Sequence, residues 1–259
     1  MKNFLFCFLF FISTHLIAQS QISITYIGNM GVLISDNTQS VLIDGLHEKY
    51  GDDYLFPPEN LVDKITNGNN GYATPLLLLY THMHGDHFNG KLTDKFTTKH
   101  PQTIIMGAKQ VINTLKLSKN TKSIHTLNYN KQLFSFPGFS VKAFKMDHAG
   151  NRHKNVENVA YIVNIGDEAI LHVGDSTWHE GKDLWELAKI KEENISTAIL
   201  PYWMLLHDEA EKFTSQFLSG ARIIATHISP RIQEKDLIAL KKRYPKIVFL
   251  TTLEEHIKL

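Results

Sequence analysis

Short apolar stretches and helical repeats alternate along most of the chain. Runs whose apolar residues are continuous or alternate, bounded by Gly, Pro, Asn or Asp, predict β-strands at residues 22–27, 31–35, 40–44, 75–80, 103–106, 133–136, 140–146, 159–165, 169–173, 197–201, 223–226 and 247–251. Segments whose apolar residues recur with the helical period predict helices at residues 59–66, 88–98, 108–117, 181–190, 208–218 and 233–244.

The order of these elements indicates the fold class. Three strands joined by turns predict an antiparallel start, and strands then alternate with helices in both halves of the chain. No repeat or low-complexity linker divides residues 22–259. The pattern therefore predicts one α/β domain in which two sheets pack face to face, with helices on the outside.

The first residues follow a different pattern. Lys2 precedes a continuous apolar stretch at residues 4–12, and the small residue Ala18 precedes a polar segment. This arrangement is typical of a secretory signal peptide. A membrane-spanning helix needs about 20 apolar residues, and the polar residues 13–15 interrupt this one. We therefore expect cleavage of residues 1–18, export to the periplasm or the medium, and no stable membrane anchor afterwards.

Composition narrows the possible partners. The chain has 259 residues, of which 43% are hydrophobic and 20% charged, as in an ordinary globular domain. The net charge is +1 and no long basic block occurs, so nucleic acid is not an expected partner. The single cysteine, Cys7, lies in the predicted signal peptide. The mature protein would then offer no disulfide and no thiolate ligand.

Candidate chemistry is concentrated in the segment that follows the predicted strand 75–80. His82, His84, Asp86 and His87 bring four metal-binding side chains into one short run. Imidazoles and carboxylates are ligands that zinc and related divalent ions accept. Gly85 stands between the second His and the Asp, where it would allow a turn too tight for a side chain. The sequence therefore predicts a metal site at the end of this strand.

The run resembles the ligand motif of the metallo-β-lactamase superfamily, which implies an αββα four-layer sandwich. The resemblance calls for three later ligands, and the chain supplies them in order after predicted strands: His148, Asp175 and His227. It implies two divalent ions, with zinc expected and manganese or iron as alternatives. One ion would be held by His82, His84 and His148, the other by Asp86, His87 and His227, and the carboxylate of Asp175 would lie between them.

The resemblance also implies a reaction. A hydroxide shared by two metal ions would attack a lactone, ester, amide or phosphoester of a small-molecule substrate. Asp86 could orient that hydroxide as well as bind metal, which makes it the candidate catalytic residue. Asp44 closes the predicted strand 40–44 and is a candidate support for the ligand loop, with turn capping as the alternative.

Several other side chains are candidates for lining the pocket. The loop at residues 45–58 carries some of them, and a solvated loop is the alternative for each. The aromatic pair after strand 197–201 could form a wall beside the metals or pack in the core. The candidates are His47, Tyr50, Tyr54, His153, Tyr202 and Trp203.

The residues at the ligand positions distinguish between branches of the superfamily. Flavodiiron-type proteins carry a glutamate at the position of His84, and β-lactamases with a cysteine ligand lack the acidic residue at Asp175, so both are disfavoured. The chain looks most like the broad metal-dependent hydrolase branch that includes the ascorbate-6-phosphate lactonase-like proteins. Two alternatives stay open at this point: a mononuclear iron oxidoreductase similar to persulfide dioxygenases, and a non-catalytic binding module.

Overall fold

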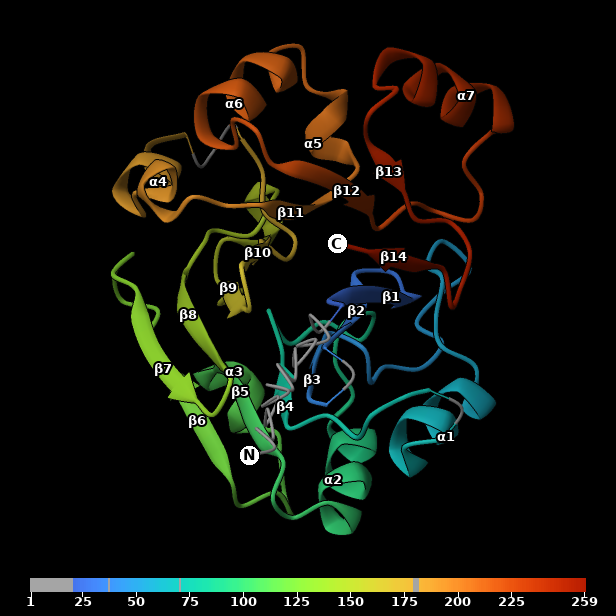
Figure 1. Cartoon of the computed structure of the whole chain (residues 1–259), viewed down its shortest axis with the longest axis vertical. Helices are drawn as coiled ribbons and strands as arrows, with labels where there is room; N and C mark the ends of the chain where they lie inside the picture. Colours follow the sequence, from blue (N-terminus) through green and yellow to red (C-terminus); the bar gives the residue numbers. More distant parts are fainter. Residues whose placement is uncertain (1–20, 37, 70, 179–181) are drawn as a thin grey trace, which may run out of the picture.

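The computed structural model describes residues 21–36, 38–69, 71–178 and 182–259 (Figure 1). The predicted signal peptide, residues 1–18, lies outside the described residues. Where the structure describes the chain, its strands form two mixed seven-stranded sheets. The domain predicted from residue 22 onward is accordingly built around a pair of sheets.

The first sheet has the order β14-β1-β2-β3-β4-β5-β6. Its first strands are antiparallel, as predicted, and the pairs from β3 to β6 are parallel. The strands are β1 (Ser23–Gly28), β2 (Gly31–Ser35), β3 (Ser40–Ile43), β4 (Leu77–Leu79), β5 (Ile104–Ala108), β6 (Thr121–Ile124) and β14 (His256–Lys258).

The second sheet has the order β13-β12-β11-β10-β9-β8-β7. Strands β7 to β10 pair antiparallel, and β10 to β13 pair parallel. The strands are β7 (Gln132–Phe136), β8 (Phe139–Lys145), β9 (Val159–Ile165), β10 (Glu168–His172), β11 (Thr197–Pro201), β12 (Arg222–Thr226) and β13 (Val248–Phe249).

Helices cover the outer face of each sheet (Figure 1). The helices α1 (Glu59–Asn67), α2 (Gly90–Lys99) and α3 (Lys109–Ile112) lie on the first sheet. The second is covered by α4 (Lys182–Leu187), α5 (Trp203–Leu206), α6 (Ala210–Phe217) and α7 (Glu234–Arg243). The predicted αββα sandwich is confirmed.

Strand β3 illustrates why the inner strands are apolar at every position. Val41 and Ile43 point into the core between the two sheets, whereas Leu42 packs under the outer helices. All three side chains are almost completely buried. A strand covered on both faces needs a continuous apolar run, because neither face meets water.

The helix predicted at residues 108–117 is wrong in length, because α3 ends at Ile112. The carboxylate of Asp94, on α2, accepts hydrogen bonds from the backbone N–H groups of Lys116, Leu117 and Ser118 at 2.9, 3.1 and 2.9 Å. A side chain that satisfies backbone donors in this way competes with helical hydrogen bonds. The chain turns here and enters β6, which the sequence pattern did not predict.

Two further short elements were not predicted from the sequence. Strand β14 is an edge strand with exposed side chains at His256 and Lys258, and it pairs antiparallel with β1. Helix α5 is a single turn. The helix predicted at residues 181–190 begins outside the described residues, and within them α4 covers its middle. None of the helices in the described ranges is long and apolar enough to cross a membrane.

The two sheets are joined by hydrogen bonds where β4 ends. The backbone N–H of Val159 donates to the carbonyl of Thr81 at 2.8 Å. The hydroxyl of Tyr161, on β9, donates to the carbonyl of Tyr80 at 2.8 Å. These links fix the start of the His-rich run against the second sheet, which carries the later ligands.

Candidate metal centre

The His-rich run leaves β4 and is fixed at its first residue by Asp44. The carboxylate of Asp44 accepts hydrogen bonds from the backbone N–H of Thr81 at 2.8 Å and from the Thr81 hydroxyl at 2.6 Å. It also accepts one from Nδ1 of His87 at 2.9 Å. Asp44 is fully buried and has a positive φ of 48°, an unusual conformation for a residue with a side chain. The turn after β3 therefore aims this carboxylate at the run.

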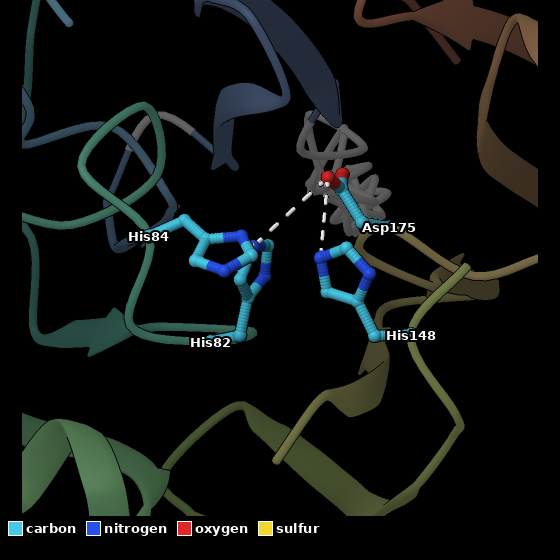
Figure 2. Close-up of side chains that lie close together, drawn as sticks. All are labelled: His82, His84, His148 and Asp175. Atoms are coloured by element: carbon cyan, nitrogen blue, oxygen red, sulfur yellow. Dashed lines mark hydrogen bonds and ion pairs between the residues drawn. The ribbon is translucent and has the colours of Figure 1, made fainter. Parts of the chain in front are cut away.

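Four side chains of the predicted set form a first group (Figure 2). Potential ligand atoms of His82, His84, His148 and Asp175 all lie within 4.8 Å of one another. Nε2 of His82 is 3.0 Å from Nδ1 of His84, and Nε2 of His148 is 3.6 Å from Oδ2 of Asp175. The His82 and His84 side chains come from the run after β4, His148 follows β8, and Asp175 follows β10.

A second group shares the same carboxylate. Potential ligand atoms of Asp86, His87, Asp175 and His227 also lie within 4.8 Å of one another. Nε2 of His87 is 3.2 Å from Oδ1 of Asp175, and Nε2 of His227 is 3.4 Å from Oδ2 of Asp86. Ligands of a tetrahedral zinc ion lie about 3.3 Å apart, given zinc–ligand distances near 2.0 to 2.1 Å. The spacing of both groups suits such an ion.

Burial and neighbouring charges shift the pKa values of the ligand histidines in opposite directions. Burial, reinforced by neighbouring histidines, lowers the pKa of His82 well below its ordinary value and that of His84 to about 4. Burial opposes protonation of His87 and His227 too, but the carboxylates of Asp175 and Asp86 outweigh it. The pKa of His87 is held well above its ordinary value, and that of His227 is raised to about 9. The carboxylates of Asp175 and Asp86 therefore favour a positively charged group beside them.

Unpartnered buried atoms test whether a cation fits here. Among the described residues, seven buried side-chain atoms have no hydrogen-bond partner, and Nε2 of His148, Nε2 of His227 and Oδ1 of Asp175 are three of them. Such an atom is costly unless something compensates it. All three belong to the two groups, and imidazole nitrogens with carboxylate oxygens are a donor set that zinc, manganese and iron accept. The residues present therefore fit two divalent ions that share Asp175.

Asn29 holds the second group in place, and the sequence reasoning missed it. Its side-chain amide donates to the backbone carbonyl of Asp86 at 3.1 Å and to Oδ2 of Asp86 at 3.0 Å. Its backbone carbonyl accepts a hydrogen bond from the N–H of His227 at 3.0 Å. Asn29 lies in the turn between β1 and β2 with a φ of 49°. The one available signal was an Asn beside glycines, which ordinarily indicates only a turn.

A cavity of about 340 Å³ opens over the two groups. It is lined by ligands of both groups and by Tyr50, Tyr54, Arg152, His153 and Trp203. Four of these five residues were expected near the pocket. Arg152 was not, because an arginine in a polar loop carries no signal that separates it from an ordinary surface residue.

Two of the expected pocket residues are placed elsewhere. The expectation that His47 faces substrate is wrong: its side chain is fully buried, and Nε2 lies 3.4 Å from the carbonyl of Gly28. Tyr202 does not line the cavity either, since it packs with Leu205 and Tyr244 under α7. A loop position and an aromatic pair indicate proximity to a site, but they do not indicate which way a side chain points.

The structural reason for Gly85 also differs from the expectation. Its φ is not positive, so no left-handed turn requires a glycine here. A Cβ atom at this position would lie 2.5 Å from Cδ2 of Tyr50. The glycine therefore makes room for the Tyr50 ring, which forms part of the cavity wall.

The four-layer sandwich with two ligand groups at the ends of its strands defines the class of protein, a metallo-β-lactamase fold. Residues 23–196 match the family described as "Beta-lactamase superfamily domain". This match covers about two thirds of the chain, and the chain belongs to this family. It includes every proposed ligand except His227, whose assignment rests on the distances above.

Solved structures with the same fold are distant in sequence. A possible metal-dependent hydrolase from Veillonella parvula DSM 2008 is 14% identical with a TM-score of 0.64, over 93% of this chain and 100% of that one. The metallo-beta-lactamase fold protein YhfI from Bacillus subtilis is 15% identical with a TM-score of 0.61, over 93% and 100%.

A third structure, the metallo hydrolase Igni18 from Ignicoccus hospitalis KIN4/I, is 14% identical with a TM-score of 0.60, over 92% and 98%. At these identities the likeness concerns the fold alone. No curated protein matches the chain in sequence. The reaction has therefore to be argued from the site.

Proposed function

We propose that the protein is a metal-dependent hydrolase that cleaves a lactone, ester, amide or phosphoester bond in a small molecule. The observation that carries the proposal is the pair of ligand groups that share Asp175 and open onto one cavity. It is supported by the descriptions of the Veillonella protein as a possible metal-dependent hydrolase and of the Ignicoccus protein as a metallo hydrolase. Fold likeness alone could not, because one fold hosts many reactions.

Each proposed ligand has a defined task. His82, His84 and His148 would hold one divalent ion, and Asp86, His87 and His227 the other, with Asp175 shared between them. Bound divalent ions lower the pKa of water and polarise the substrate oxygen. Zinc is the ion we expect, and manganese or iron would accept the same ligands.

Asp86 is the proposed catalytic residue. Its Oδ2 is held by the amide of Asn29, and the carboxylate faces the cavity. It would accept a hydrogen bond from the attacking water and so orient that water toward the substrate. In the net reaction, the water oxygen bonds to the carbonyl carbon or phosphorus, the bond to the leaving group breaks, and one water proton goes to the leaving group.

The complete second group favours this reaction over the alternatives. A mononuclear iron oxidoreductase would need only one of the two groups, yet Asp86, His87 and His227 converge as closely as the other ligands do. A non-catalytic module without metal ions would leave the buried imidazole nitrogens uncompensated, which costs free energy. Neither alternative accounts for both observations.

The test combines metal analysis with activity. We expect two ions per purified chain, and His84→Ala should lose one ion together with hydrolysis of a panel of para-nitrophenyl esters and phosphoesters. His125→Ala, a change at an exposed histidine that belongs to neither ligand group, is the matched control and should keep both. Full hydrolysis by protein stripped of its ions with a chelator would refute the proposal.

We also propose that the protein is exported, on the strength of the signal-peptide pattern in residues 1–18. Expression with the native N-terminus should give a mature chain that starts at Gln19 outside the cytoplasm. Amino-terminal sequencing of fractionated cells decides this. Recovery of the chain from the cytoplasm with Met1 retained would exclude export.

A further inference from the structure

The cavity above the two ligand groups has chemically different ends. At the end formed by the second group, the ring of Tyr54 meets His227 edge-on at 5.4 Å between centroids, and the ring of Trp203 meets it at 4.7 Å. The indole N–H of Trp203 donates to the carbonyl of Ser176 at 3.0 Å, which fixes the ring. Two aromatic side chains from different parts of the chain therefore flank the same ligand.

The other end, at the first group, is polar and basic. The ring of His153 lies 4.9 Å from His84 and 4.6 Å from His148, between centroids. Nε of Arg152 donates a hydrogen bond to Nε2 of His153 at 2.7 Å. This bond uses one N–H of the guanidinium and leaves the others for a partner. Arg152 is thereby tied to the wall of the cavity.

The charge partners of Arg152 differ from those of Arg231 and Arg243. Within the described ranges it forms no ion pair with a carboxylate, whereas Arg231 and Arg243 each do. The carboxylates in the cavity wall, Asp86 and Asp175, face histidines of the ligand groups instead. Guanidinium is always charged and binds carboxylate or phosphate oxygens in a forked geometry. An arginine without a carboxylate partner beside the ligands is thus a ready receptor for an anion.

From this polarity we infer the class of substrate. The substrate carries an anionic group, a carboxylate or a phosphate, that binds Arg152, and a planar apolar group that lies against Tyr54 and Trp203. The bond to be cleaved lies between the two groups, over the ligands. The position of that bond rests on the proposed hydrolase function, whereas the binding of an anion and a planar group does not.

The first experiment compares two esters that share a leaving group. We expect the metal-loaded protein to prefer the anionic para-nitrophenyl hydrogen glutarate over the neutral para-nitrophenyl butyrate. Arg152→Gln should raise KM for the anionic ester roughly 10- to 100-fold more than for the neutral ester, the effect of one lost charge-assisted hydrogen bond. Lys154→Gln removes the same charge from the same loop outside the cavity and should change neither.

The second experiment measures binding without turnover. Phenylpentanoate, its uncharged amide and the equivalent phosphonate are titrated while tryptophan fluorescence is followed. Trp178 and Trp185 are buried away from the cavity, so a change reports Trp203, and Trp203→Phe should abolish it. We expect the acids to bind at least tenfold more tightly than the amide, with that advantage lost in Arg152→Gln and kept in Lys154→Gln.

The outcomes distinguish a failure of the inferred binding site from a failure of the proposed reaction. Equal affinities for acid and amide, or the same loss in Arg152→Gln and Lys154→Gln, would overturn the inference even if both esters were hydrolysed. Hydrolysis of neither ester, with binding of the acids that depends on Arg152, would exclude the ester-cleaving form of the proposed reaction and support the binding site. The better ligand of the two acids tells whether the anion is a carboxylate or a phosphate.

Discussion

Replacing Asp44 by asparagine tests how the ligand loop is oriented. The variant keeps the shape of the side chain, and its oxygen can still accept the hydrogen bond from the backbone N–H of Thr81. An NH2 group would take the place of Oδ2, which now accepts from both the Thr81 hydroxyl and Nδ1 of His87. The new NH2 group would then face the Thr81 hydroxyl and the Nδ1–H of His87, which are both hydrogen-bond donors as well. The hydroxyl can rotate, whereas the imidazole can respond only by moving its proton to Nε2.

That proton would occupy the lone pair that His87 needs as a metal ligand. Loss of such an orienting partner weakens metal binding by about 10- to 100-fold, or about 1.4 to 2.7 kcal/mol. The ion of the other group should be affected less, because Nδ1 of His82 lies against the Thr81 hydroxyl at 3.0 Å and not against Asp44. Asp44→Asn should therefore separate the affinities of the two ions.

Calorimetric titration of the metal-free protein with zinc measures both affinities. Asp63→Asn, which removes one carboxylate from the exposed face of α1, is the matched control and should bind zinc like the unmodified protein. Thr81→Val should instead weaken binding of the ion held by the first group, since it removes the hydroxyl beside His82. A folded Asp44→Asn protein with both zinc affinities unchanged would refute the assigned orienting role.

Other predictions concern packing and pH. Gly85→Ala should cost less than about 1 kcal/mol of unfolding free energy, because only the exposed ring of Tyr50 has to move. Gly174→Ala should cost several times more in the same urea titration, since its φ is +60° and the new Cβ would lie 2.3 Å from Oδ1 of the buried Asn158; equal costs would contradict the reasoning. Burial disfavours the charged form of Asp94, but the Ser118 hydroxyl and the N–H groups of residues 116–118 outweigh it and lower its pKa. Because the folded-state pKa is the lower one, Asp94 contributes stability above its unfolded pKa near 3.9 and loses it as pH falls through the folded value. Asp94→Asn should therefore be destabilising at pH 7 and nearly neutral at about pH 2; a gap in unfolding free energy independent of pH would exclude this role.

The ligand groups could be anticipated because their chemistry is visible locally. His82, His84, Asp86 and His87 lie within one short run, and His148, Asp175 and His227 each follow a readable apolar strand. Parallel strands place their carboxyl ends at a common edge, so the fold class itself implies that such residues meet. Most strands were predictable because continuous apolar runs signal strands covered on both faces, whereas the more exposed strands β6 and β14 were not predicted.

Residues whose partners lie far away in the sequence gave no such local signal. Asn29 lies 57 positions before Asp86, and nothing in a turn between two strands indicates which carboxylate it will reach. Asp94 likewise ends α3 by hydrogen bonds to residues 22 to 24 positions away. Whether His47 would face the cavity or the protein interior depended on packing that only the folded chain defines.

The same hydrogen bonds that build the fold also prepare the site. Asp44, at the end of β3, fixes Thr81 and His87, while the carbonyl of Thr81 accepts the N–H of Val159 from the second sheet. A change that loosens this junction should therefore disturb the ligands and the contact between the sheets together. By contrast, Arg152 and Trp203 lie outside that network of ligand supports. Evolution of a new substrate preference can alter them without altering the metal ligands, which is how one sandwich could serve many small molecules.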